Sequence, residues 1–380
     1  MSLDQIFGGG EHEKRIFKIP EYQRGYSWEE EQRTDLFKDI GYLIKAGCRH
    51  KHYTGTIVAS DTGQEKLGYK VFDLVDGQQR VTTLILFLFV ICRKLRESGE
   101  ESKSNEIFRK FIRDGDIGNP VFKLELEQQQ RLGAYFEELL EKVPSEDLTS
   151  RSHHNLKNAV GECQAWLDKQ GDIDAVLRCV REKLGFLVYI PKDEDKDKEI
   201  GIMFEVINNR GKPLSELDKI KNYLIYFSEK NDLESIKKKV VDSWSEILRN
   251  LDKADCTNNE NENSFLRNCW IVFQYPDKAL RHHVYDNLKK AWPPDYDGNV
   301  KIVEEIKAFI DFLKNASFSY AKYSTRENVT GAEKSWLERI SHHPVDASIM
   351  PLILAISNRA KGQNDRKDLF ELLEKLNFRY

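Results

Sequence analysis

The chain has 380 residues, 40% of them hydrophobic, so it fills the cores of about two or three domains and is not a disordered protein. A formal net charge of −4 excludes nucleic-acid binding through a positive field over the whole molecule, and any such contact needs a local basic patch. The six cysteines contain no CxxC pair and the first residues lack a secretory signal, so we expect a reduced, cytoplasmic protein without a zinc site or a disulfide framework.

Segments rich in β-branched and aromatic residues predict strands in the first half of the chain. These segments cover residues 15–19, 53–59, 69–75, 121–126 and 184–190. A helix over residues 78–96 follows the third segment and completes a strand–turn–helix unit. Its apolar run, residues 81–92, is shorter than the roughly 20 residues of a membrane-spanning helix. We therefore expect a buried core helix and no membrane contact.

Beyond residue 192 the hydrophobic spacing is helical, as in Val303, Ile306, Phe309, Ile310 and Leu313. The charge run at 191–199 predicts a solvated connection, and Thr257–Ser264 predicts a polar loop. We expect an α+β domain over residues 1–230, with a small mixed sheet and surrounding helices, followed by an all-α domain over residues 231–380.

The most informative motif is Asp76-Gly77-Gln78-Gln79-Arg80, at the junction of the third strand and its helix. Helix capping explains two of its residues, because Asp76 is a good cap and Gln79 can reach back to complete a capping box. Capping does not explain Gln78 and Arg80, two further polar side chains at the start of an apolar helix. Helix N–H groups, the helix dipole and a guanidinium together suit an anion, and phosphate is the expected ligand.

A second motif follows the first predicted strand and reads IPEYQRGYSW. Its aromatic residues, with Gln23 and Arg24 between them, suit stacking on a planar ligand by Tyr22 or Trp28 while Arg24 clamps phosphate. The alternative is that the aromatic residues pack in the core and that Arg24 pairs with a carboxylate such as Asp76.

A third segment, residues 204–222, reads FEVINNRGKPLSELDKIKN. Ser215 and Asp218 predict a capping box, so the residues before them form a loop between two helices. This loop carries donors that suit a polar or phosphorylated ligand, namely Asn208, Arg210 and Lys212. Turn chemistry alone would also select Asn and Gly here.

The segments IPEYQRGYSW, HYTGTIV, DLVDGQQRVTTL and FEVINNRGKPLSELDKIKNYL, in this order, resemble the amino-terminal family of GmrSD-type Type IV restriction enzymes over roughly residues 15–230. That domain is similar to the ParB/sulfiredoxin fold, so the resemblance implies a sheet core of this type. It also implies that Asp76 to Arg80 support nucleotide binding and hydrolysis, and that the IPEYQRGYSW segment lines the same pocket. The implied role is defence against foreign DNA that carries modified bases or a modified backbone.

The resemblance further implies a nuclease domain with a His-Asn-His-like metal site, whose pattern this chain lacks. His342-His343-Pro344 with Asn358 is the nearest match, but residues 349–355 predict a core helix. We expect the nuclease to be a separate domain or subunit, and not this chain. Three other polar pairs are expected on solvated helix faces, namely His153-His154, His282-His283 and Lys221-Asn222.

Two functions fit these residues. The first is an NTP-hydrolysing sensor and regulatory module of a modification-dependent restriction system, in which Arg80 and Arg24 neutralise phosphate and Asp76 binds Mg²⁺ or orients water. Gln78 or Gln79 then positions water or the nucleotide. The remaining nucleotide-binding residues are expected to be Tyr22, Gln23, Trp28, Gly77, Asn208, Arg210 and Lys212.

The alternative function is a non-enzymatic DNA-recognition module, in which the same pocket grips a phosphate or a flipped base without turnover. The expected partners are modified or foreign DNA, a nuclease domain or subunit of His-Asn-His type, and a second copy of the chain in a homodimer. A nicking nuclease built from the sheet core itself is the least favoured reading, because no cluster of carboxylates accompanies Asp76.

Overall fold

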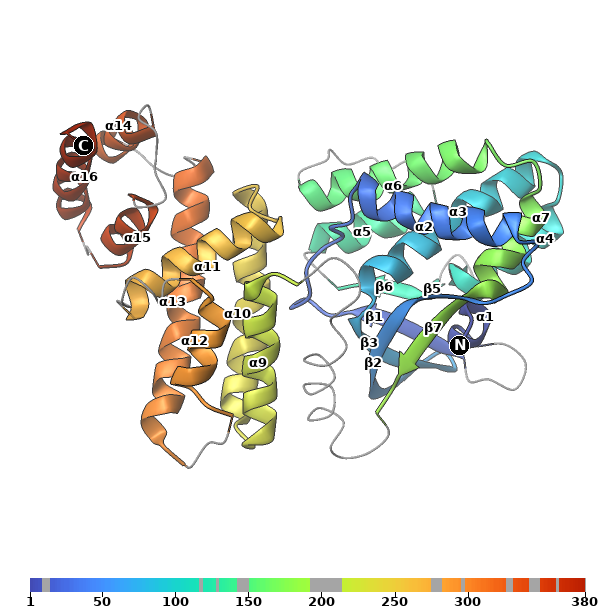
Figure 1. Ribbon diagram of the computed structural model, residues 1–380, viewed down its shortest axis with the longest axis horizontal. Helices are drawn as coiled ribbons and strands as arrows, with labels where there is room; N and C mark the ends of the chain where they lie inside the picture. The colour runs from blue at the N-terminus through green and yellow to red at the C-terminus, as the bar shows by residue number, and fades with distance from the viewer. Residues whose placement is uncertain are drawn as a thin grey trace. The chain divides into compact units, whose positions relative to one another are not determined.

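The computed structural model describes residues 1–8, 14–115, 119–127, 130–141, 150–191, 214–274, 282–294, 298–325, 331–341, 349–359 and 362–379. The chain divides into two compact units, Met1–Pro213 and Leu214–Tyr380 (Figure 1). The expected boundary at residue 230 would place the division after helix α9 (Glu216–Lys230). The structure places it before this helix. The reason is that α9 packs on α10 (Glu234–Lys253) of the second unit.

A mixed five-stranded sheet forms the centre of the first unit, in the order β6-β1-β3-β2-β7. Strand β1 is parallel to β3 and β6, whereas β2 is antiparallel to β3 and parallel to β7. The strand bounds are Arg15–Ile19 for β1, His52–Lys66 for β2, Tyr69–Asp76 for β3, Leu124–Leu126 for β6 and Leu184–Tyr189 for β7. The expected α+β class is therefore confirmed.

The strand predictions hold closely at three segments and differ at two. Strand β2 continues well beyond the predicted end at residue 59. The predicted strand 121–126 is broken at Lys123, so that β5 (Val121–Phe122) pairs with β4 (Arg113–Asp114) while β6 pairs with β1. The apolar alternation persists across the break, which is why the sequence reads as one strand.

Helices α2, α3 and α6 lie on the same side of this sheet (Figure 1). The central one, α3 (Gln78–Glu97), confirms the predicted core helix, and its residues 84–88 are almost completely buried. A helix that is apolar around its whole circumference needs neighbours on all sides. For α3 these neighbours are α4, α6 and the sheet. The other helices of this unit are α1 (Leu3–Ile6), α2 (Glu30–Lys45), α4 (Glu101–Phe111), α5 (Gln130–Leu139), α6 (Arg151–Leu167), α7 (Ile173–Arg178) and the π-helix η1 (Cys179–Lys183).

No helix in the described ranges is long and apolar enough to cross a membrane. The expectation of fully reduced cysteines is wrong, because Cys48, just after α2, forms a disulfide with Cys179 at the start of η1. These cysteines are 131 residues apart in the sequence, and only the fold brings them together. The four other cysteines are free and buried.

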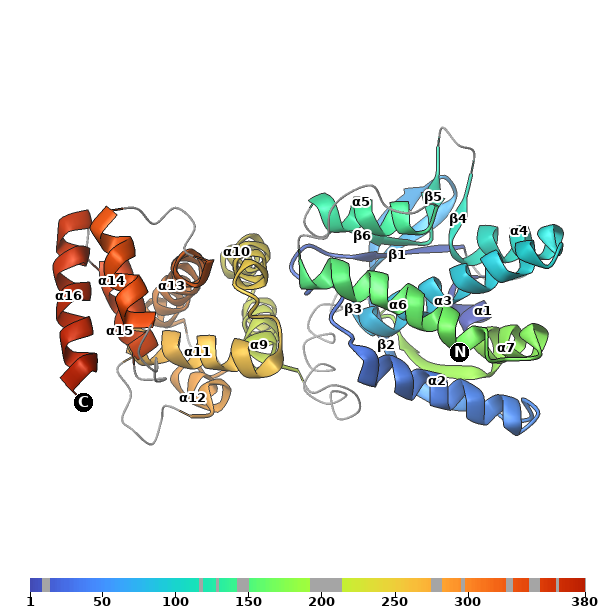
Figure 2. The same ribbon diagram turned by 90° about the horizontal axis from the view of Figure 1, so that it is seen from above.

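The described regular structure of the second unit is entirely helical, as expected. Helix α13 (Val300–Thr325) carries the predicted apolar positions, and it packs against α10, α11 and α15 (Figure 2). The other helices are α11 (Asn259–Gln274), α12 (Val284–Ala291), α14 (Gly331–Ser341), α15 (Ile349–Arg359) and α16 (Gln363–Arg379). The buried residues of α15 agree with the predicted core helix there.

Three polar segments differ from their predicted environments. The loop predicted at Thr257–Ser264 is wrong, because α11 begins at Asn259, and the side chain of Asn258 accepts the N–H of Asn261 in its first turn. Lys221 is buried, with its Nζ 3.9 Å from the Asp218 carboxylate, and His153 is buried with its ring bonded to Ser150. The charge run from residue 192 and the His342-His343 pair lie outside the described residues.

A buried lysine stands where the predicted strand breaks. The Lys123 side chain is 2% exposed, and its Nζ lies 3.5 Å from the centroid of the Tyr69 ring and 3.9 Å from the Asp114 carboxylate. That carboxylate accepts the Tyr69 hydroxyl, and Nζ has no hydrogen-bond partner among the described residues. Burial lowers the pKa of Lys123 from its ordinary value of 10.5 to about 8.

We predict that Lys123→Met stabilises the protein at neutral pH. The lowered pKa corresponds to about 3 kcal/mol of unfavourable free energy for the buried ammonium, which sets the upper limit of the gain. Wild type suffers this penalty fully below pH 8 and loses it as the pH rises toward 10.5, so the advantage of the variant shrinks over that range. Thermal unfolding at pH 7 and pH 10 measures the difference.

Lys14→Met is the matched control, since Lys14 lies over the same ring but is exposed. The Lys14 charge contributes to the lowered pKa of Lys123, so we expect Lys14→Met to raise the melting temperature much less than Lys123→Met at pH 7. An advantage of Lys123→Met that is equal at both pH values would contradict the assignment of the penalty to a buried charge.

Candidate functional site

The IPEYQRGYSW and DGQQR motifs meet at one end of the sheet. The IPEYQRGYSW motif follows β1 and the DGQQR motif follows β3, and because these neighbouring strands are parallel, both motifs emerge at the same end. Strand β2 runs the opposite way and pairs Val58 with Asp76, so the residues that begin β2 also lie at this end. Three segments distant in the sequence therefore build one site.

The turn into α3 requires glycine. Gly77 has a φ of +88°, and a Cβ there would lie 2.9 Å from the carbonyl oxygen of Thr56. Gly77 is itself the N-cap residue of α3, and no side chain caps the helix. The predicted capping box of Asp76 and Gln79 is therefore wrong, because both side chains have other partners.

Gln79 fixes the loop between β1 and α2. Its Nε2 donates to the Gly25 carbonyl at 2.9 Å, and its Oε1 accepts the Ser27 N–H at 2.7 Å. Since both ends of its amide are bonded to the loop, Gln79 acts as a positioning residue. Gln23 adds a further bond from the loop, with its buried Nε2 donating to the Val75 carbonyl at 3.2 Å.

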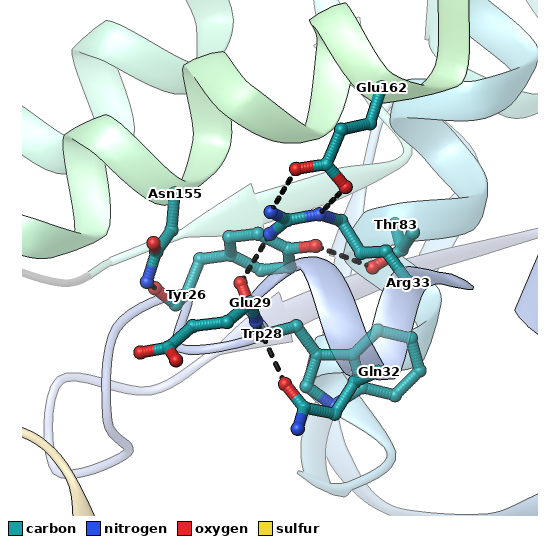
Figure 3. A network of polar contacts seen from close by, with 8 residues as sticks. All are labelled: Tyr26, Trp28, Glu29, Gln32, Arg33, Thr83, Asn155 and Glu162. Carbon is teal, nitrogen blue, oxygen red and sulfur yellow. Dashed lines mark hydrogen bonds and ion pairs between the residues drawn. The ribbon is translucent and has the colours of Figure 1, made fainter. Parts of the chain in front are cut away.

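Tyr26 and Arg33 secure the same loop from the helix side (Figure 3). Tyr26 is buried, and its hydroxyl shares a 2.8 Å hydrogen bond with Thr83 of α3, which confirms core packing for this aromatic residue. The buried Arg33 guanidinium donates to the Trp28 carbonyl. It also makes a bidentate pair with Glu162 of α6, at 2.7 Å from Nε and 2.5 Å from Nη2.

Arg80 lies at the centre of this arrangement. Its Nη1 donates to the Thr56 carbonyl at 3.3 Å, and its Cζ lies 5.8 Å from the centroid of the Trp28 ring. Among the described residues, the bond to Thr56 is the one hydrogen bond that the Arg80 side chain makes, and Arg80 forms no ion pair with any of them. Burial lowers the pKa of Arg80, although the charges of Asp76 and Asp39 oppose that shift.

Gly55 makes room for this guanidinium. A Cβ on Gly55 would lie 2.6 Å from both Cζ and Nη1 of Arg80, and the φ of Gly55 is +142°. Strand β2 is irregular here, with a register shift against β7 between Tyr53 and Gly55. The glycine of the HYTGTIV segment is therefore explained by close approach of Arg80, which residue patterns alone did not reveal.

Asp76 ends β3 beside this charge. Its carboxylate accepts the Gly77 N–H, and burial raises its pKa, although that hydrogen bond and the Arg80 charge oppose the shift. The alternative drawn from the sequence paired Asp76 with Arg24. The arginine whose charge acts on the Asp76 carboxylate is instead Arg80. Gln78 is buried, and its side chain makes no hydrogen bond to any residue that the structure describes.

The other predicted site residues divide into two groups. Tyr22, Arg24 and Trp28 are partly buried in the loop after β1, and Trp28 packs against the hydrophobic core. Asn208, Arg210 and Lys212 lie outside the described residues. Of the helix that follows them, the predicted cap is confirmed, because the Ser215 side chain accepts the Asp218 N–H at 3.2 Å.

Within the described ranges, no three His, Cys, Asp or Glu side chains are gathered as a metal site of protein ligands would require. Asp76 is the one predicted metal ligand. A single carboxylate is compatible with Mg²⁺, which is commonly held in proteins by one or two carboxylates and the phosphates of its substrate.

Comparison with known families gives one result. Residues 3–225, more than half of the chain, match the family model of the GmrSD restriction endonuclease N-terminal domain. No curated protein matches the chain. The matched range covers all the described residues of the site.

We predict that Gly55→Ala destabilises the protein by at least about 2 kcal/mol, because the methyl group displaces the Arg80 guanidinium and strains the backbone. Gly63→Ala is the matched control, since Gly63 also has a positive φ, +71°, but lies in open space. We expect it to cost about 1 kcal/mol, from backbone strain alone. Thermal unfolding of both variants measures the difference, and equal losses would refute the steric role of Gly55.

Proposed function

Because this chain belongs to the GmrSD restriction endonuclease N-terminal domain family, and is thereby a module of a restriction system, we propose that it is an NTP-binding and NTP-hydrolysing sensor that regulates DNA restriction. The proposed nucleotide site is formed by Arg80, Gln78 and Asp76.

The observation that carries this proposal is the environment of Arg80. The fold partly buries this guanidinium, yet within the described residues gives it a single backbone carbonyl as hydrogen-bond acceptor. A partly buried guanidinium with so few acceptors can bind an anion through charge-assisted hydrogen bonds. A phosphate group matches its planar set of donors.

Two neighbouring features support a phosphate ligand. Arg80 and Gln78 lie in the first turn of α3, where the backbone N–H groups have no intrahelical acceptors and the helix dipole favours negative charge. The Gln78 amide, which has no partner among the described residues, would hydrogen-bond a phosphate oxygen or the attacking water. Gln79 holds the loop after β1 against this turn and thereby fixes the site.

Asp76 would serve the hydrolytic step. Its carboxylate lies beside Arg80 and is oriented by the Gly77 N–H. In the proposed site it binds Mg²⁺ together with the nucleotide phosphates, and the ion neutralises charge on the transferred phosphoryl group. Phosphoryl transfer depends mainly on such neutralisation and on positioning, and Arg80 and Gln78 provide both.

As a restriction module, the chain would act with DNA and with a nuclease domain or subunit, for which the family's description as an endonuclease is the support. In this proposal the nucleotide state of the Arg80 site reports on the DNA and controls the nuclease. Foreign DNA with modified bases or a modified backbone remains the proposed target.

We predict that Arg80→Ala weakens NTP binding about 10- to 100-fold, because it removes charge-assisted hydrogen bonds to phosphate. Hydrolysis should fall by at least about 100-fold. Gln78→Ala should lower the hydrolysis rate less. Titration calorimetry with Mg²⁺-NTP and a phosphate-release assay provide the two readouts.

Arg93→Ala is the matched control, since Arg93 is an exposed arginine of the same helix and should leave both readouts unchanged. Unchanged binding and turnover in Arg80→Ala would exclude this site. Salt-dependent DNA binding by wild type without any phosphate release would instead support a non-enzymatic DNA-recognition module.

A further inference from the structure

An exposed tyrosine stands beside the Arg80 site, on the strand segment that contacts Arg80. The Tyr53 side chain near the start of β2 is 46% exposed. Tyr53 thus presents an aromatic surface next to the proposed phosphate site.

Thr56 links this ring to the guanidinium. The Thr56 side-chain hydroxyl lies 3.0 Å from the Tyr53 hydroxyl, and the Thr56 backbone carbonyl accepts Nη1 of Arg80 at 3.3 Å. Thr56 is itself buried, so it provides a fixed support for both groups. The register shift between Tyr53 and Gly55 brings residues 53 and 56 together, although they are three positions apart.

The other aromatic residues near the site are less suitable for stacking. Tyr26 is buried, and Trp28 is packed against the core with Arg80 over its ring. Tyr42 is 66% exposed, but its neighbour is the His52 ring, whose Nε2 pairs with Asp39 at 3.2 Å. Tyr53 alone among these is both exposed and tied to the residue that holds Arg80.

We propose that Tyr53 is the stacking surface for the nucleobase of the nucleotide whose phosphates bind Arg80. This inference rests on the proposed function and adds its base subsite. Stacking on an aromatic ring uses the π-face that every base has, so it discriminates weakly between bases. The site is therefore expected to accept more than one nucleoside triphosphate, with purines bound more tightly because their rings are larger.

The test compares a ligand that has a base with one that lacks it. Calorimetry on the full chain measures the affinity for Mg²⁺-ATP and for Mg²⁺-tripolyphosphate, in wild type, Tyr53→Ala, Tyr53→Phe and Arg80→Ala. Tyr53→Ala should weaken ATP binding about 5- to 100-fold and leave tripolyphosphate binding unchanged. Tyr53→Phe keeps the ring, so most of the ATP affinity should remain. Arg80→Ala should weaken both ligands.

Tyr42→Ala is the matched control, an exposed tyrosine outside the proposed subsite, and should bind both ligands as wild type does. If Tyr53→Ala binds ATP normally while Arg80→Ala does not, the stacking role is overturned and the nucleotide site stands. Equal losses for ATP and tripolyphosphate in Tyr53→Ala would also overturn it, because the tyrosine would then only support Arg80. Loss of DNA binding with normal ATP binding would assign the ring to DNA instead. If wild type binds neither ligand, the nucleotide site and its base subsite both fall.

Discussion

The first unit is organised around a positive charge that it partly buries without a carboxylate hydrogen-bonded to it in the described part of the chain. Arg80 rests between the Cα of Gly55, the Trp28 ring and the Thr56 carbonyl, which come from strand β2 and from the loop after β1. That arrangement requires α3 to begin immediately after β3, which the turn at Gly77 makes possible. It also requires a rigid loop after β1, which Gln79 and Arg33 hold from two sides. In the proposed function, an entering anion would therefore meet a site that is already assembled.

The sequence predicted well whatever depends on neighbouring residues. Strands β1, β3 and β7 and the core helix α3 follow from local alternation and from continuous apolar runs, and their bounds agree with the prediction within about one residue. The predicted cap at Ser215 was confirmed for the same reason, because its partner is three residues away. The meeting of the two motifs could also be inferred, since both follow predicted strands and share an implied pocket.

The predictions failed where the partner is distant in the sequence. Gln79 was assigned to Asp76, three positions away, but bonds to Gly25 and Ser27 across the site. Gly55 carried no local sign of its role, because the atom it accommodates belongs to a side chain 25 positions later. The Cys48–Cys179 disulfide belongs to the same class. In each case local chemistry allowed two environments, and only tertiary packing selected one.

The acceptors that hold the site together are mostly main-chain carbonyls. Val75, Gly25, Trp28 and Thr56 each contribute a backbone oxygen, whereas the donors are the side chains of Gln23, Gln79, Arg33 and Arg80. Every residue type has a carbonyl, so these hydrogen bonds place no demand on the side chains at the accepting positions. Tolerance to substitution is thus unevenly distributed. The four donor side chains are required for these hydrogen bonds, whereas the accepting positions can use their side chains for other purposes, such as the Trp28 ring beside Arg80 and the Thr56 hydroxyl beside Tyr53.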